Sequence, residues 1–354
     1  MTMLRRMVRH PLFWPVLALV VLIIVNTISR PSFVSITVKD GGLYGSLIDI
    51  LPNSSQLMLV SLGMTLVIAT RGIDLSVGAV LAVSGAVSLT IIGSSNSPGD
   101  LGTVTVAILT GLLVTLVLGI WNGFLVSVVK IQPIIATLLL MFAGRGIAML
   151  ITKGQITTIT SAPYRYLSSG HLFGLPVAFL IALVVVVLVA LVVRRTALGM
   201  LLEAVGINPE ASRLAGVQSR GIIWMVYALS GVLAGLAGIL YSSNISAADA
   251  NNAGLNIELD AILAVVIGGT SLMGGKFSIS GTVVGVLVIQ TLTTSITFLG
   301  VPPAVTPLFK ALVVIVICLV QSQKARDMLF SRRRRRAAAP AAAVAQAEAE
   351  AVAR

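Results

Sequence analysis

Charged residues are scarce in this 354-residue chain. They make up 10% of it, whereas ordinary soluble domains carry about 25%. Hydrophobic residues reach 57% and the mean hydropathy is +1.04, so the composition excludes a soluble globular domain and indicates an integral membrane protein. The apolar runs are long and continuous rather than alternating, which excludes a membrane β-barrel. We therefore predict an all-α, polytopic fold.

Residues that build metal and redox sites are also nearly absent. Cys318 is the single cysteine, and His10 and His171 are far apart, which excludes a disulfide framework and makes a metal site improbable. The stretch nearest to a phosphate loop, GGTSLMGGKF (268–277), has Thr270 in place of the first glycine and Phe277 in place of the magnesium-binding Ser/Thr. We expect no catalytic, metal or cofactor site in this chain, and expect these glycines to let helices pack closely.

The net charge of +12 is distributed as in a membrane protein. Five arginines form one run at 332–336, and most others mark the ends of hydrophobic segments. No basic patch with interleaved aromatics is present, so we expect no nucleic-acid partner. We predict a membrane domain over 1–330 and a disordered polybasic, Ala-rich tail over 331–354 whose arginines contact anionic lipid.

Several apolar segments have the length of a membrane-spanning helix. The ten candidates are 12–28, 54–70, 75–93, 102–120, 134–152, 175–193, 222–243, 259–275, 279–298 and 308–323. We interpret the first as an uncleaved helix because no small-residue cleavage site follows it. With the N-terminus inside, 18 of the 24 Lys and Arg lie on the inner side, 4 on the outer side and 2 in spans. This asymmetry predicts that both termini are cytoplasmic.

The two halves of the chain share a pattern. IDLSVGAVLAVSG (73–85) opens the third span and LDAILAVVIGGTS (259–271) opens the eighth, each with one aspartate, Asp74 or Asp260, near its start. Spans 2–5 and 7–10 would have opposite orientations, which is the pattern of an inverted-topology repeat.

A polar interruption at 194–221 separates the sixth and seventh spans. LGMLLEAVG has the apolar spacing of a short helix, Gly206, Asn208 and Pro209 break the chain, and EASRLAGV supplies a second helical turn that ends at Gly216. A soluble partner protein could bind such a helix–break–helix on the cytoplasmic side. The alternative is a loop that only connects two spans.

Polar residues inside or beside the spans are the candidates for a solute path or gate, because each needs a partner or water there. They are Asp74, Asn122, Arg145 and Asp260. Arg145 could instead form a buried ion pair with Asp74 or Asp260, and Asn122 beside Trp121 favours an interfacial anchor.

The segment 243–261 is expected to face outward and contains no Lys or Arg. Its carboxylates and amides suit sugar hydroxyls or the basic residues of a docking protein, although an acidic outer loop without a role has the same composition. The residues concerned are Asp249, Asn251, Asn252, Glu258 and Asp260.

Four blocks together resemble bacterial ABC-type sugar permeases of the ribose/xylose/galactofuranose branch. The blocks are GMTLVIATRGIDLSVGAVLAVSGAV (63–87), GIWNGFLVSVVKIQPIIATLLLMFAGRGIA (119–148), LGMLLEAVGINPEASRLAGV (198–217) and ELDAILAVVIGGTSLMGGKFSISGTVVG (258–285). The resemblance covers roughly residues 45–323. GGLYGSLIDIL (41–51) and DANNAG (249–254) favour galactofuranose over ribose.

The resemblance implies a membrane subunit of an importer in the bacterial inner membrane. Two permease chains, identical or paralogous, sit on two ATPase subunits that bind ATP and magnesium, and a periplasmic binding protein delivers the sugar. The family's cytoplasmic coupling motif corresponds to Glu203, Ala204, Gly206, Asn208, Ala211 and Gly216, with Ser212 where alanine is usual. A permease for another sugar is the main alternative, and a stand-alone secondary transporter or channel is a distant one.

Overall fold

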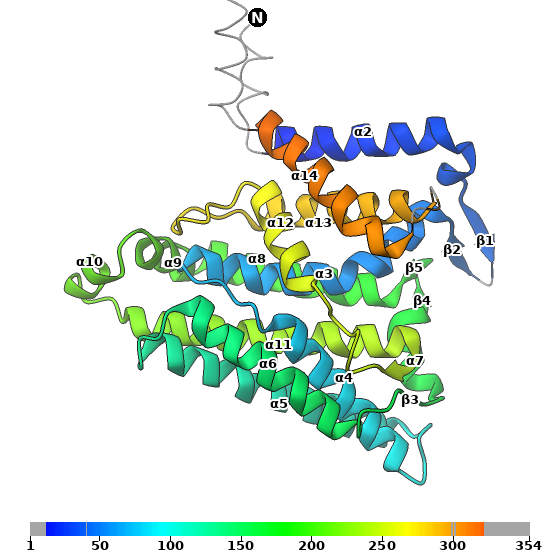
Figure 1. The fold of residues 1–354 in the computed structure, drawn as a ribbon, viewed down its shortest axis with the longest axis horizontal. Helices are drawn as coiled ribbons and strands as arrows, with labels where there is room; N and C mark the ends of the chain where they lie inside the picture. Colours follow the sequence, from blue (N-terminus) through cyan, green and yellow to red (C-terminus); the bar gives the residue numbers. More distant parts are fainter. Residues whose placement is uncertain (1–11, 40, 299, 301, 322–354) are drawn as a thin grey trace, which may run out of the picture. The chain divides into compact units, whose positions relative to one another are not determined.

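The computed structural model describes residues 12–39, 41–298, 300 and 302–321, and this part of the chain is almost entirely helical (Figure 1). Its α-helices are α2 (Phe13–Ser29), α3 (Ser46–Ala69), α4 (Val77–Ser94), α5 (Leu101–Ser127), α6 (Pro133–Ile151), α7 (Ala162–Ser169), α8 (Val177–Arg195), α9 (Leu198–Ile207), α10 (Pro209–Leu214), α11 (Ser219–Ile245), α12 (Ile257–Ile267), α13 (Ile279–Phe298) and α14 (Thr306–Gln321). Seven of these helices are long and apolar enough to cross a membrane, so the predicted all-α polytopic fold is confirmed.

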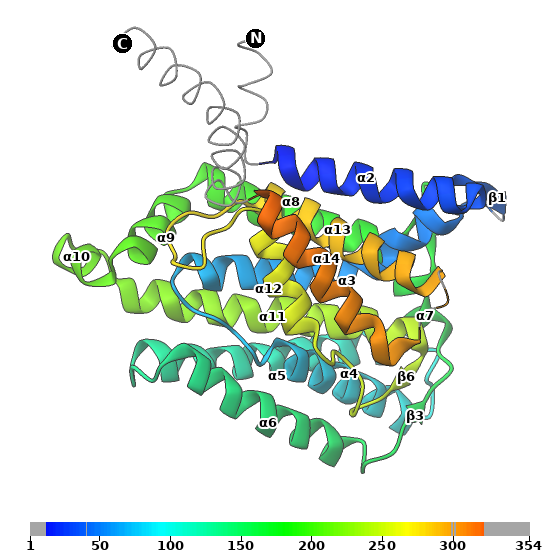
Figure 2. The ribbon, with the colours of Figure 1, turned by 45° about the horizontal axis from the view of Figure 1, so that its top comes forward.

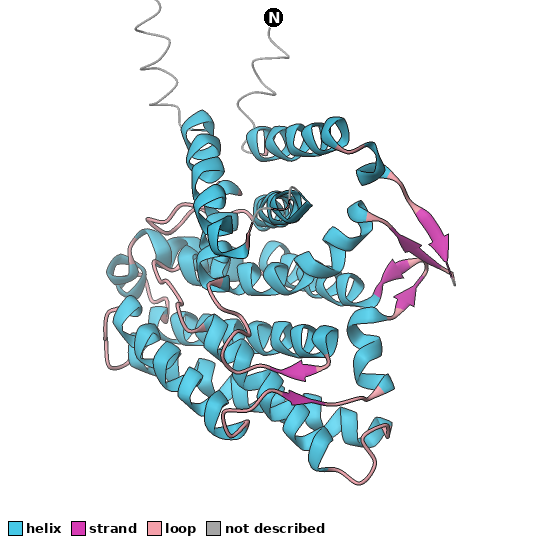
Figure 3. Cartoon of the chain, turned by 45° about the vertical axis from the view of Figure 1, so that its right-hand side comes forward, coloured by secondary structure: helices cyan, strands magenta, loops and turns pink. Residues whose placement is uncertain are grey.

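Short elements fill the connections. Two 3-10 turns are present, η1 (Pro31–Val34) and η2 (Pro303–Val305). Three antiparallel strand pairs are β1 (Thr37–Lys39) with β2 (Gly42–Tyr44), β3 (Thr157–Thr158) with β6 (Ala247–Ala248), and β4 (His171–Leu172) with β5 (Leu175–Pro176). Figure 3 shows these strand pairs gathered at one side of the helices.

The chain divides into two compact units, 1–299 and 300–354. Helices α2 to α13 belong to the first, and η2 with α14 to the second. The predicted tail 331–354, with its arginine run and its boundary at 330, lies outside the described residues.

The predicted eighth span, 259–275, is wrong in its length. The helix α12 has 11 residues and ends at Ile267. Gly269, Gly274 and Gly275 then take φ angles of +86°, +82° and +81°, a backbone that favours glycine over other residues, so the chain turns instead of continuing as a helix.

Burial separates inner from outer helices in the first unit. In α3 and α4, 78% and 72% of the residues in the apolar 18-residue stretch of the helix are buried, whereas the share is 28% for α5 and for α6 and 22% for α8. Figures 1 and 2 show α5 and α6 along one flank and α2 along the other, with α3 and α11 between them. The outer helices therefore present apolar side chains to the outside of the unit, as is typical of spans at the edge of a bundle.

Helix α11 packs closely on its neighbours because its buried face is built of small residues. A Cβ atom at Gly231 would come within 2.8 Å of the Gly119 Cα in α5, and one at Gly238 would overlap the Leu81 carbonyl in α4. The expected close packing of Gly231-x-x-x-Gly235 and Gly281-x-x-x-Gly285 is confirmed, the second against Gly268 and Ala264.

Two helix breaks meet inside this unit. The chain is non-helical between α3 and α4 at 70–76. It is also non-helical between α11 and α12 at 246–256, a segment that includes the short strand β6. The breaks touch where α4 begins, because Gly78 and Gly254 approach each other closely. Opposed broken helices are what an inverted repeat would produce, and the repeat itself stays a prediction.

Candidate functional site

The turn between α9 and α10 lies at one end of the first unit, opposite the end that carries α7 and the strand pairs (Figure 1). Asn208 leaves the helical conformation, and its side-chain oxygen accepts hydrogen bonds from the backbone N–H groups of Glu210 (3.1 Å) and Ala211 (3.0 Å). Pro209 occupies the first position of α10, where its missing N–H costs nothing. The predicted helix–break–helix is confirmed, and Asn208 is the N-cap that separates the helices.

Gly206 anchors this turn to the rest of the unit. It is buried, and a Cβ atom there would overlap the Ala69 carbonyl oxygen at the end of α3 and the backbone N of Gly275. The Gly275 N–H donates to the same Ala69 oxygen at 2.9 Å. Only glycine lets three backbone segments meet so closely.

Arg71 strengthens the same junction. Its guanidinium donates to the Met273 carbonyl oxygen at 3.1 Å and to the Ile207 carbonyl oxygen. It thus connects the end of α9 to the loop 268–278. The glycines of that loop, which we expected to let helices pack closely, therefore also hold the turn.

Other side chains of the turn face outward. Glu203 and Ala211 are exposed, Ala204 is half-buried, and Gly216 ends α10 with a φ of +86°. Large apolar side chains at this end are also exposed: Met200 by 73%, Ile207 by 65%, Leu214 by 78% and Met273 by 79%. Exposed apolar side chains outside the spans indicate a protein-binding surface.

Ser212, where the family usually has alanine, is 6% exposed. Its hydroxyl donates to the Asn208 carbonyl oxygen at 2.9 Å, which supports the cap rather than disturbing it.

Glu210 and Arg213 form an ion pair of 2.6 Å on the surface of α10. The hydrogen bond from Arg213, and then its charge, lower the pKa of Glu210. Because the pair is exposed, it orders one turn of helix and adds little to stability.

Arg145 lies in α6 and reaches the break before α12. Its Nη1 donates to the carbonyl oxygens of Ala250 (2.9 Å) and Ala253 (2.7 Å). The charges of Glu258 and Asp249 also act on it. The alternative of an ion pair with Asp74 is wrong, because the Asp74 carboxylate is hydrogen-bonded to Ser76 and Ser230. The pairing with Asp260 stays a prediction.

Asp74 lies in the other break and is 2% exposed. Its carboxylate accepts hydrogen bonds from the Ser76 hydroxyl (2.6 Å) and N–H (3.1 Å) and from the Ser230 hydroxyl (2.9 Å). Asn122 is 1% exposed and donates to the Ser76 hydroxyl at 2.8 Å. The interfacial role favoured for Asn122 is therefore wrong, since the network draws its amide into the core.

Some polar groups of the acidic and amide-rich segment 243–261 form hydrogen bonds with one another. The Asp249 carboxylate accepts from the N–H groups of Asn251 and Asn252 (both 3.1 Å) and from the Asn252 amide (2.8 Å). Burial alone would raise the pKa of Asp249, but the hydrogen bonds from Asn252 and Asn251 outweigh it and lower that pKa. Asn251 and Asn252 are exposed, whereas Glu258 and Asp260 are half-buried in the first turn of α12.

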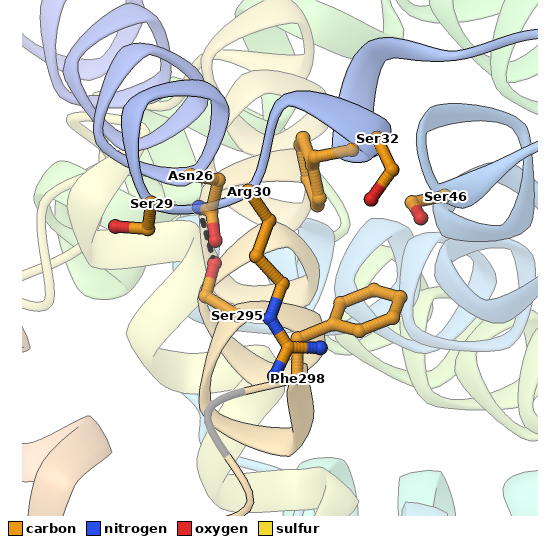
Figure 4. A pocket seen from close by; sticks show the side chains of 8 residues that line it. Asn26, Ser29, Arg30, Ser32, Ser46, Ser295 and Phe298 are labelled. Carbon is orange, nitrogen blue, oxygen red and sulfur yellow. Dashed lines mark hydrogen bonds between the residues drawn. The ribbon is translucent and has the colours of Figure 1, made fainter.

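A small pocket lined by both polar and aromatic side chains, which no sequence motif predicted, lies between α2, η1, α3 and α13. It has a volume of about 90 Å³, and Asn26 Nδ2 donates to Ser295 Oγ at 2.6 Å across it (Figure 4). The Arg30, Ser29 and Ser32 side chains also line it. The hydroxyls are spread over four elements, which is why no local motif reveals the pocket.

A larger cavity of about 460 Å³ lies between α8, α9 and α11, and leucine and valine side chains dominate its lining. It offers almost no hydrogen-bond groups for a sugar, so it suits lipid chains.

Comparisons with known proteins show the family of this chain. The family model described as "Branched-chain amino acid transport system / permease component" matches residues 46–319. A galactofuranose transporter permease protein of Escherichia coli (strain K12) is 48% identical over 323 residues, covering 90% of this chain and 92% of the relative. No solved structure matches the chain.

Two further relatives carry other sugar names. A fructose import permease protein of Bifidobacterium longum (strain NCC 2705) is 42% identical over 92% of this chain and 91% of its own length. A ribose import permease protein of Escherichia coli (strain K12) is 37% identical over 87% of this chain and 92% of its own length. With helices of membrane length and a capped turn that exposes apolar side chains, the chain belongs to this family of ABC transporter permeases, the non-catalytic transmembrane subunits of the transport system.

Proposed function

We propose that this chain is the membrane subunit of a binding-protein-dependent importer for a monosaccharide, and that the sugar is galactofuranose. The 48% identity to the galactofuranose transporter permease over 90% of the chain supports this substrate. Fructose is the main competitor because of the 42% identical fructose permease, and ribose or xylose follow.

The observation that carries the coupling role is the α9–α10 turn. Its apolar side chains Met200, Ile207 and Leu214 are exposed, while Gly206 is packed against the end of α3. An ATPase subunit that binds the exposed side would therefore move α3 and the loop 268–278 together with the turn. ATP and magnesium would be bound by that subunit, and this chain would supply no cofactor ligand.

The distribution of basic residues supports an inner-membrane protein with both termini in the cytoplasm. The α9–α10 end of the unit carries Arg71, Lys130, Arg194, Arg195, Arg213, Arg220 and Lys276, and the opposite end Arg30, Lys39, Lys153 and Arg165. By the positive-inside rule, this asymmetry supports a cytoplasmic position for the α9–α10 turn.

A second permease chain, identical or a close paralogue, would complete the solute path. Asp74 and Asn122 are buried within one chain, so half-buried Arg145 and Asp260 are better candidates to line a path between chains. Exposed Asn251 and Asn252, with Asp249 and Glu258 beside them, are the candidates to meet a periplasmic sugar-binding protein. The arginine run 332–336 is proposed to bind anionic lipid.

The test is co-purification of this chain with the ATPase and binding protein encoded nearby, followed by reconstitution. ATPase activity is then measured while the binding protein is loaded in turn with galactofuranose, fructose, ribose and xylose. Stimulation by one loaded sugar identifies the substrate. An ATPase that never co-purifies would overturn the proposal and make a stand-alone transporter the leading function.

A further inference from the structure

A cavity of about 410 Å³ lies at the α9–α10 end, beside the turn to which the proposed function assigns ATPase binding. It is enclosed by the end of α5, the turn into α6, α10 and the start of α11. The polar side chains that line it are Ser127, Lys130, Glu210, Arg213, Ser219 and Arg220.

The charges around this cavity are unbalanced. Glu210 is the one carboxylate in its lining, and it is already paired with Arg213 at 2.6 Å. The charges of Lys130 and Arg220 also act on Glu210, so both cations lie near it, yet neither forms an ion pair with a described residue. The cavity thus keeps an excess of positive charge, and α11 adds the positive end of its helix dipole because Ser219 begins that helix.

Ser127 adds a buried hydroxyl to this lining. It is 4% exposed and lines the cavity, but its hydroxyl has no hydrogen-bond partner among the described residues. A buried hydroxyl without a partner is costly, and most hydroxyls in helices avoid this by donating to a carbonyl one turn earlier.

Lys130 is held in an unusual backbone conformation, with a φ of +64°. A left-handed backbone costs a non-glycine residue about 1 kcal/mol. Glycine would close the α5–α6 turn more easily, so a lysine there indicates a use for its side chain.

We propose that this cavity binds a phosphate-bearing anion, held by Lys130, Arg220 and Arg213 with the Ser127 hydroxyl as a further partner. Val126 and Ile223 also line it and belong to α5 and α11, two helices long enough to span the membrane. The bound phosphate could therefore belong to the headgroup of an anionic lipid or come from solution. The proposal needs neither the sugar nor the ATPase.

Binding is measured on the full-length chain in nanodiscs of phosphatidylcholine with and without phosphatidylglycerol, and separately with inorganic phosphate added to the phosphatidylcholine discs. Thermal stability and native mass spectrometry report the bound anion. We expect the double substitution Lys130→Gln with Arg220→Gln to weaken binding about 100-fold or more, since each substitution removes a charge-assisted hydrogen bond to the anion inside the cavity. The matched control is Arg194→Gln with Arg195→Gln, which removes the same charge at the same end and should leave binding unchanged.

A second variant separates binding from folding. Lys130→Gly removes the side chain while suiting the left-handed backbone, so the protein should stay as stable as before in phosphatidylcholine and still lose the anion. Lys153→Gly, at a φ of +54°, makes the same change at the other end and should keep it.

Stabilisation by phosphatidylglycerol alone assigns the site to a lipid, and stabilisation by inorganic phosphate assigns it to a soluble anion. Equal behaviour of wild type and the Lys130 variants toward both anions would overturn the proposal. The proposal would also be overturned if these variants bound the anion as wild type does but no longer co-purified with the ATPase subunit, because the cavity would then be part of a protein interface.

Discussion

Gly78 and Gly254 touch where the two helix breaks meet. A Cβ atom at Gly254 would come within 2.7 Å of the Gly78 carbonyl oxygen, and one at Gly78 would overlap the Gly254 carbonyl oxygen. The Glu258 carboxylate also lies 2.6 Å from the position of a Cβ atom at Gly78. The breaks are therefore held together by backbone packing, with no room for even a methyl group.

Replacing Gly78 with alanine should destabilise the protein by about 1–3 kcal/mol, the usual cost of overpacking. The measurement is the thermal transition of the detergent-solubilised protein, followed by size-exclusion chromatography. Gly146→Ala in α6 is the control, because no atom lies within 4 Å of its Cβ position. If both variants melted at the same temperature, the close contact at Gly78 would be wrong.

Gly206→Ala tests the anchoring of the α9–α10 turn. The added methyl group overlaps the Ala69 carbonyl oxygen, so we expect a loss of about 1–3 kcal/mol and weaker stimulation of the ATPase by the loaded binding protein. Gly221→Ala in α11 has open space around it, with the nearest atom at 3.9 Å, and should behave as wild type. Normal stimulation in Gly206→Ala would mean that the anchor is not needed for coupling.

Leu214→Asp tests the docking surface without touching the core. The side chain is 78% exposed, so stability should change by less than about 0.5 kcal/mol while co-purification with the ATPase is lost. Leu101→Asp, at a side chain 70% exposed at the start of α5, is the matched control at the opposite end. An unchanged yield of the complex in Leu214→Asp would exclude Leu214 from the interface.

Arg145→Met removes the donor that holds the break before α12. Hydrogen bonds to a charged group contribute about 1.5–3 kcal/mol, so a loss of this order is expected in the thermal transition. Arg145→Lys can reach one carbonyl and should lie between Met and wild type. Sugar uptake, measured in the same variants, would show whether the segment must be held for transport, and equal stability of all three proteins would contradict the contacts described for Arg145.

Substitutions of Asp74 test the buried hydrogen-bond network between the first helix break and α11. Asn at this position can still accept from Ser76, and the Ser230 hydroxyl can turn to accept from the new amide, so Asp74→Asn should cost less than about 1 kcal/mol. Asp74→Leu leaves the Ser76 and Ser230 hydroxyl protons and the Ser76 N–H without their acceptor and should cost about 2–5 kcal/mol. The reverse order in a melting experiment would show that the charge of Asp74 matters more than its hydrogen bonds.

Local sequence was sufficient to predict much of the secondary structure of this protein. Runs of apolar residues predict where the helices lie because a backbone in lipid must satisfy its own hydrogen bonds. Asn208 and Pro209 predict the break between α9 and α10 because a cap and a proline act within one turn of helix. The small residues of α11 likewise predict close packing, since a missing side chain permits it whichever helix is the neighbour.

Only the tertiary structure decided which distant residues meet. The sequence placed Asn122 at an interface and offered Asp74 as a partner of Arg145, whereas the fold buries Asn122 against Ser76 and directs Arg145 to the Ala250 and Ala253 carbonyls. The predicted eighth span stopped at Ile267 because the loop that follows packs against Gly206 and Arg71, far away in sequence. Hydrophobicity acts on each segment separately, whereas hydrogen bonds and backbone contacts between segments depend on how the helices assemble.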